Sequence, residues 1–109
     1  MPYPIIDALA GQSVLLNGKL LSADAAEAGF LFQPQDERMY YEVIRVVQRV
    51  PLFLEDHLER LNRSVDRSFA IPSDLAAEGQ MLVKANSLTE ANLRIVLTRH
   101  LRVMHLTPS

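Results

Sequence analysis

Cysteine is absent from this chain of 109 residues. Its absence excludes disulfide bonds, thiolate metal sites and cysteine nucleophiles, and with them a secreted module held together by disulfides. Apolar runs are short, and none approaches the ~20 residues that a membrane-spanning helix requires. The opening residues Met1-Pro2-Tyr3-Pro4 lack the basic stretch and following apolar stretch of a signal peptide. We therefore expect a cytoplasmic protein that does not bind membranes.

Other features are scarce as well. The net charge of −2 provides no general attraction for nucleic acid. Lysine occurs only as Lys19 and Lys84, whereas the chain has nine arginines. The four glycines are scattered singly, so the sequence has no glycine-rich phosphate loop. The histidines show no metal-ligand spacing, and we expect no metal site.

The length predicts a single domain, residues 1–109. Asn17-Gly18 between two apolar runs is typical of a type I′ turn, so a β-hairpin is expected over Ser13–Leu21. Further extended segments are rich in β-branched, aromatic or alternating apolar residues. They are Tyr40–Gln48, Pro51–Leu54 and Asn92–Arg99, the last of which Leu101–Leu106 is expected to continue.

Two helices are expected between these strands. Apolar residues recur every three or four positions from Leu54 to Phe69, which predicts a one-sided helix over Glu55–Ala70. A second helix is expected from Asp74 to about Ser87. Because each helix has one apolar face, both require the same sheet surface. The sequence therefore predicts an α+β fold, a mostly antiparallel sheet with two helices packed on one face.

The first helix carries Arg60, Arg63 and Arg67 on one face, where they can bind a phosphate or a carboxylate. The pattern alone favours an ordinary charged surface, because Asp56 precedes Arg60 by four residues and Glu59 precedes Arg63 by four. His57 lies beside the apolar stripe, and we interpret it as a packing or capping residue.

Side chains alternate along the strand that begins at Tyr40. Tyr41, Val43 and Arg45 share one face, where a phenol and a guanidinium can together bind a substrate carboxylate. The alternative is a half-exposed sheet face without a ligand.

Two motifs occur in series, Tyr41-Glu42-x-x-Arg45 on the strand and His57-x-x-Arg60-Leu61 on the helix. With residues 16–20 upstream and 93–99 downstream, their order and spacing closely resemble the N-terminal small domain of the class IV aminotransferases. These are pyridoxal-phosphate enzymes of fold type IV, which include branched-chain and D-amino acid transaminases and aminodeoxychorismate lyase. The resemblance implies that Arg60 binds the cofactor phosphate and that Tyr41 and Arg45 line the substrate side.

The resemblance also implies what this stretch does not contain. The family's catalytic lysine lies in a second, larger domain, and neither Lys19 nor Lys84 occupies a matching position. We therefore expect a small domain that does not catalyse transamination alone. The alternative is a non-catalytic oligomerisation or anion-binding module derived from the family. We expect a homo-oligomer that buries the stretch Leu101–Leu106, because both faces of that segment are apolar.

Overall fold

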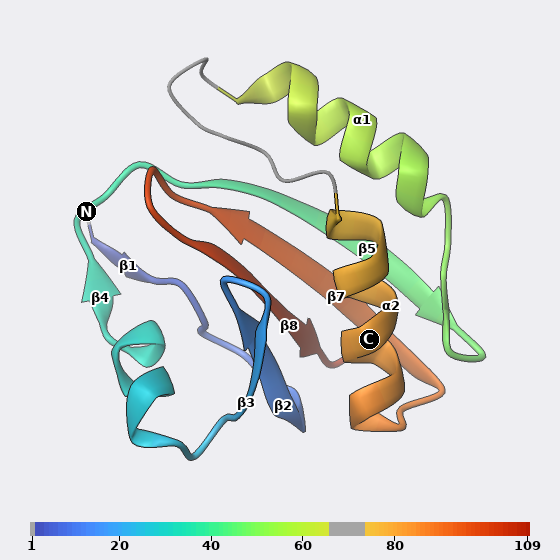
Figure 1. The fold of residues 1–109 in the computed structure, drawn as a ribbon, viewed down its shortest axis with the longest axis horizontal. Helices are drawn as coiled ribbons and strands as arrows, with labels where there is room; N and C mark the ends of the chain where they lie inside the picture. Colours follow the sequence, from blue (N-terminus) through green and yellow to red (C-terminus); the bar gives the residue numbers. More distant parts are fainter. Residues whose placement is uncertain (1, 66–73) are drawn as a thin grey trace.

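The computed structural model describes residues 2–65 and 74–109. In chain order the elements are β1 (Tyr3–Pro4), β2 (Ala10–Leu16), β3 (Lys19–Ser22), the 3₁₀ helix η1 (Ala26–Phe32), β4 (Pro34–Gln35), β5 (Tyr40–Val47), β6 (Val50–Pro51), α1 (Leu54–Ser64), α2 (Leu75–Asn86), β7 (Glu90–Leu97) and β8 (Arg102–Thr107). An antiparallel six-stranded sheet has the order β3-β2-β8-β7-β5-β6, and β1 pairs separately with β4 (Figure 1).

Both α-helices lie on one side of the large sheet (Figure 1). α1 packs along β5, and α2 contacts β2, β6 and β8. The main apolar core fills the space between helices and sheet, with helix residues that include Leu54, Leu61 and Leu82 against strand residues that include Ile44 and Leu93. The predicted α+β fold with both helices on one face is therefore confirmed.

The opposite sheet face has its own apolar layer. Ile5 and Ile6 from the N-terminal segment and Leu31 from η1 pack against strand residues such as Val14 and Val103. The backbone N–H of Ile6 donates to the carbonyl oxygen of Leu31 at 2.9 Å, which ties the two covering segments together. This second layer covers the sheet at β2 and β8, where the sequence pattern predicts no covering element.

The segment 101–106 does not continue the preceding strand, so that expectation is wrong. The backbone N–H of Leu101 donates to Thr98 Oγ1 at 3.1 Å, and the Thr98 N–H donates to the Leu101 carbonyl at 2.9 Å. This turn sends β8 back between β7 and β2. Val103, Met104, His105 and Leu106 are buried within their own chain. The predicted cover on both faces exists, but the helices and the N-terminal segment supply it, so burial of this stretch by a second chain is also wrong.

Local backbone geometry decides the remaining element boundaries. Asn17 and Gly18 both have positive φ, at 52° and 82°, which confirms the predicted hairpin. The returning strand β6 stops at Pro51, because Phe53 adopts a left-handed conformation and leads directly into α1. That helix ends at Ser64, where Val65 is extended, so it is shorter than predicted. The rest of the expected helix, residues 66–70, lies outside the described residues.

An irregular stretch of β2 is held by one side chain from α2. Pairing of β2 with β8 shifts register between Ala10 and Leu15, and Gly11 within this stretch has a φ of 82°. Asn86 Oδ1 accepts hydrogen bonds from the backbone N–H groups of Gln12 and Ser13, each at 2.9 Å. Asn86 Nδ2 donates to the Ser13 and Leu82 carbonyls, each at 3.1 Å. One amide thus supplies the partners that the interrupted ladder lacks.

Candidate functional site

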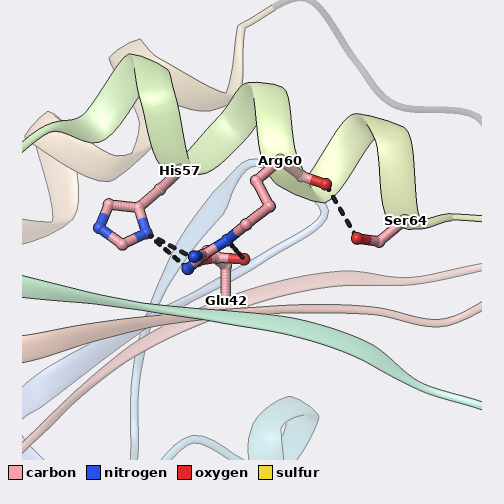
Figure 2. Close-up of polar contacts among 4 residues, drawn as sticks. All are labelled: Glu42, His57, Arg60 and Ser64. Atoms are coloured by element: carbon pink, nitrogen blue, oxygen red, sulfur yellow. Dashed lines mark hydrogen bonds and ion pairs between the residues drawn. The ribbon is translucent and has the colours of Figure 1, made fainter.

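A buried carboxylate lies between β5 and α1. Glu42 shares the inner face of β5 with Ile44 and Val46, and its side chain is only 8% exposed. Arg60, one turn from the end of α1, donates from Nη2 to Glu42 Oε1 and from Nε to Oε2, the second contact at 3.4 Å (Figure 2). The strand alternation and the helix register therefore bring together two charges that lie 18 residues apart in sequence.

His57 is the third member of this cluster. Its Nδ1 lies 2.6 Å from Glu42 Oε1 and 3.3 Å from Arg60 Nη2 (Figure 2). His57 and Arg60 are one turn apart on α1, so both reach down to the same strand residue. At the end of the helix, the Ser64 hydroxyl donates to the Arg60 carbonyl at 2.9 Å. We refer to Glu42, His57 and Arg60 as the carboxylate cluster.

Electrostatics keep Glu42 and Arg60 charged. Burial alone would raise the pKa of Glu42, but hydrogen bonds from Arg60 and His57 and their charges hold that pKa below its ordinary value. The hydrogen bond and charge of Glu42 in turn raise the pKa of Arg60. Glu42 is therefore an ionised hydrogen-bond acceptor at neutral pH, and Arg60 is held in one orientation by an ionised partner.

A shallow cavity of about 330 Å³ lies against α1 beside the carboxylate cluster. Its lining residues are Phe53, Asp56, His57, Arg60 and Arg63. The Arg60 side chain is 60% exposed, so it is accessible to a ligand although it is held by Glu42. Arg63 pairs with Glu59 at 3.3 Å on the exposed helix surface, which agrees with the surface-pair interpretation for that residue. Arg60 does not follow that interpretation, because its ion-pair partner is Glu42 from the sheet.

The outer face of β5 carries the other predicted site residues. Tyr41 is 60% exposed on this face, and Arg45 pairs with Glu90 at 3.3 Å. Arg94 from β7 lies with its Cζ 5.1 Å from the centre of the Tyr41 ring. A cavity of about 680 Å³ is lined by both Tyr41 and Arg94, together with Tyr3, Pro4, Asp7 and residues 35–39. Arg45 does not line it.

Contacts with the N-terminal segment and with β8 hold the Arg94 side chain in place. Its Nη1 donates to the Ile5 carbonyl at 2.5 Å and lies 3.4 Å from Nε2 of the fully buried His105. Burial, followed by the nearby Arg94 charge, lowers the pKa of His105 to about 4, although backbone groups of Ala8 and Leu106 act in the opposite direction. A neutral imidazole beneath Arg94 accepts a hydrogen bond without adding a second positive charge.

The structure separates the predicted site residues into two groups. Arg60 lies on the helix side of β5, whereas Tyr41 and Arg45 lie on the opposite face of the same strand. Sequence reasoning missed the roles of Glu42 and His57 in holding Arg60. The available signal was an acidic residue at an inner-face position between apolar neighbours, because a buried carboxylate requires a cationic partner. Arg94 was missed because it appeared only as an alternating polar residue of a strand.

Neither lysine lines these cavities. Lys19 on β3 has its Nζ 3.1 Å from Glu27, and Lys84 lies on α2. Among residues 2–65 and 74–109, no group of three or more histidine, aspartate and glutamate side chains is placed to hold a metal ion.

Within the part of the chain that the structure describes, no helix has the length and apolar character needed to cross a membrane.

Comparison with known proteins identifies the family. Comparison with curated proteins finds no match. The family model described as amino-transferase class IV matches residues 39–105, a stretch that contains both motifs and the whole carboxylate cluster. Because this match covers more than half of the chain, the protein belongs to the class IV aminotransferase family.

Proposed function

We propose that this domain is the small domain of a pyridoxal-phosphate-dependent aminotransferase or aminodeoxychorismate lyase-like protein, in which Arg60 binds the cofactor phosphate. The observation that carries the proposal is the guanidinium of Arg60, held by Glu42 at the wall of a cavity that His57 and Arg63 also line. Cationic donors around a cavity suit a phosphate group. When bound, the cofactor supplies an electron sink for reactions at the substrate α-carbon.

The residues present fit the phosphate end of the cofactor and not its reactive end. Reaction requires a lysine at the cofactor's carbonyl carbon. Lys19 is engaged with Glu27, and neither Lys19 nor Lys84 lines a cavity beside Arg60 or Tyr41. Our proposal therefore assigns the lysine to a separate large domain and assigns no catalytic turnover to these 109 residues alone.

The outer face of β5 is the proposed substrate-side wall, carrying Tyr41 and Arg45. The stacking of Arg94 on Tyr41 supports this assignment, because it places a fixed guanidinium in the 680 Å³ cavity beside an exposed phenol. Such a pair can bind a carboxylate of an amino acid or an aminochorismate-type substrate. Arg45 lies on the same face, where it pairs with Glu90 at 3.3 Å outside the cavity lining.

A non-catalytic anion-binding or oligomerisation module is the second candidate. Neither lysine lines the cavities beside Arg60 and Tyr41, which favours this candidate, because an anion-binding site needs no lysine to hold the cofactor. Self-association stays a prediction. The exposed side chains of Tyr41 and Val43 on the open face of β5 support it, since such surfaces often bind another protein surface.

Binding of pyridoxal phosphate to the 109-residue chain, measured by calorimetry, tests the assignment of Arg60. Arg60→Ala removes a charge-assisted contact, so this variant should bind pyridoxal phosphate roughly ten- to hundred-fold more weakly than wild type. Arg99→Ala removes an exposed arginine in the turn between β7 and β8 and should leave the affinity unchanged. Pyridoxal without its phosphate should bind wild type and Arg60→Ala equally. Equal affinity of Arg60→Ala and wild type for pyridoxal phosphate would overturn the assignment. Turnover of an amino donor by the isolated chain would overturn the absence of catalysis.

A further inference from the structure

The contact between His57 and Glu42 determines which imidazole nitrogen is available to a ligand. Nδ1 lies 2.6 Å from Glu42 Oε1, and the pKa of Glu42 is held below its ordinary value, so this oxygen is an ionised acceptor. A hydrogen bond of this kind requires the proton on Nδ1. Figure 2 shows the other ring nitrogen pointing away from Glu42. Nε2 is therefore the nitrogen left to interact with a ligand, and its state depends on whether the ring is protonated.

The surroundings of His57 are mixed in charge. From β5 it faces Glu42, and from α1 it shares the 330 Å³ cavity with Asp56, Arg60 and Arg63. Arg60 is also within 3.3 Å of His57 Nδ1. In this cavity Arg60 pairs with Glu42 and Arg63 pairs with Glu59, so protonation of His57 would add a further positive charge to the lining.

The two protonation states of His57 present opposite chemistry to an anion. In the neutral ring, with its proton on Nδ1, Nε2 carries a lone pair that repels a phosphate oxygen. In the protonated ring, Nε2–H is a charged donor, and Glu42 remains beneath it as counter-ion. Protonation of the imidazole therefore adds a charge and a donor N–H to the site in one step.

We propose that His57, oriented by Glu42, is a second phosphate ligand beside Arg60 and makes phosphate binding at this site depend on pH. This inference rests on the proposed phosphate role of Arg60 and adds a regulation to it. Binding of an oxyanion favours the protonated ring, so a proton is taken up wherever His57 is neutral before binding. Affinity falls as the pH rises and His57 loses its proton. Glu42 acts as a positioning residue, because it fixes both Arg60 and the Nδ1–H form of the ring.

Sulfate is the suitable probe, because it stays dianionic across the pH range, whereas phosphate itself titrates. Sulfate binding to the 109-residue chain is measured by calorimetry from pH 5.5 to 8, in buffers of different ionisation enthalpy at pH 6.5. The affinity of the wild type should fall roughly tenfold or more with rising pH, as expected for loss of a charged donor. The heat at pH 6.5 should vary with the buffer, which reports proton uptake.

Variants separate His57 from the other groups. His57→Gln should bind sulfate with a flat pH profile and no buffer dependence, whereas His100→Gln, an exposed histidine in the β7–β8 turn, should keep both effects. Arg60→Ala should weaken binding at every pH. If Arg60→Ala binds weakly while His57→Gln keeps the wild-type slope, the role of His57 is wrong and that of Arg60 stands. If wild type binds neither sulfate nor phosphate at any pH, both proposals fail.

A measurement on the wild-type protein removes dependence on how the variants fold. Long-range ¹⁵N–¹H NMR of the imidazole distinguishes the two neutral forms of His57. At pH 8 the Nδ1–H form should predominate in wild type and should lose its predominance in Glu42→Gln. An Nε2–H form in wild type would contradict the proposal, because a neutral ring would then already carry a donor on the nitrogen that points away from Glu42.

Discussion

Replacement of Asn86 by alanine tests how the interrupted strand β2 is held to the rest of the fold. The change removes four hydrogen bonds: two accepted from backbone N–H groups and two donated to carbonyls. The exposed Gln12 amide regains a water partner, whereas the Ser13 amide and carbonyl are partly shielded. At about 1 kcal/mol for each shielded bond the loss is about 2–3 kcal/mol, of which roughly 0.5 kcal/mol is recovered through alanine's helix propensity.

We therefore expect Asn86→Ala to lower the free energy of unfolding by about 2 kcal/mol. In a domain of this size that corresponds to a fall in Tm of roughly 8–16 °C. Urea unfolding followed by circular dichroism measures the change. Asn62→Ala is the matched control, because this exposed asparagine lies within α1 and its replacement should change stability by about 0.5 kcal/mol or less. A loss below 0.5 kcal/mol for Asn86→Ala, or the same loss in both variants, would refute the reasoning.

Two further predictions concern Gly11 and His105. Gly11→Ala forces alanine into a φ of 82° and places its Cβ 2.3 Å from Asn86 Oδ1, so we expect the free energy of unfolding to fall by about 3 kcal/mol. The control is Gly29→Ala, whose added Cβ meets nothing within 4 Å and which should unfold at the wild-type urea midpoint. Coincident midpoints for the two variants would contradict this prediction. His105 has its pKa lowered from 6.5 to about 4 in the folded state, so the unfolded state binds more protons between these values. The free energy of unfolding should then fall by about 2 kcal/mol from pH 7 to pH 5, and a flat urea-unfolding profile over that range would show that the buried ring titrates normally.

Much of the fold was predictable because local signals and packing agree. Asn17-Gly18 specifies its turn by backbone preference alone, and the recurrence of Leu54, Leu58 and Leu61 specifies which face of α1 is buried. The reversal before β8 was not predictable in the same way. It depends on the Thr98 side chain accepting a backbone N–H, without glycine or proline to mark a turn. The end of α1 at Ser64 was missed because the apolar spacing continues in the sequence beyond the helix.

The site shows the same division between local and long-range information. Arg60 was singled out by the family resemblance and not by the helix pattern, whereas the strand alternation correctly separated Tyr41 and Arg45 from Glu42. The pairing of Glu42 with His57 and Arg60 depends on how α1 lies across β5, which no local pattern specifies. A buried acidic residue in a strand requires a cationic partner, but the sequence contains several arginines that could be that partner.

The central place of β8 has a consequence for how the chain acquires its structure. Among the strands of the described residues, β2 and β7 do not pair with each other, and β8 alone joins the N-terminal hairpin to the remainder of the large sheet. A chain emerging from the ribosome therefore presents two separate half-sheets until residues 102–107 are available. Closure of such sequence-distant pairs is entropically slow, so the assembled fold forms after synthesis of this strand and not progressively along the chain. The exposed edges of β2 and β7 await their shared partner during that interval, which is the period in which pairing with another chain competes with folding.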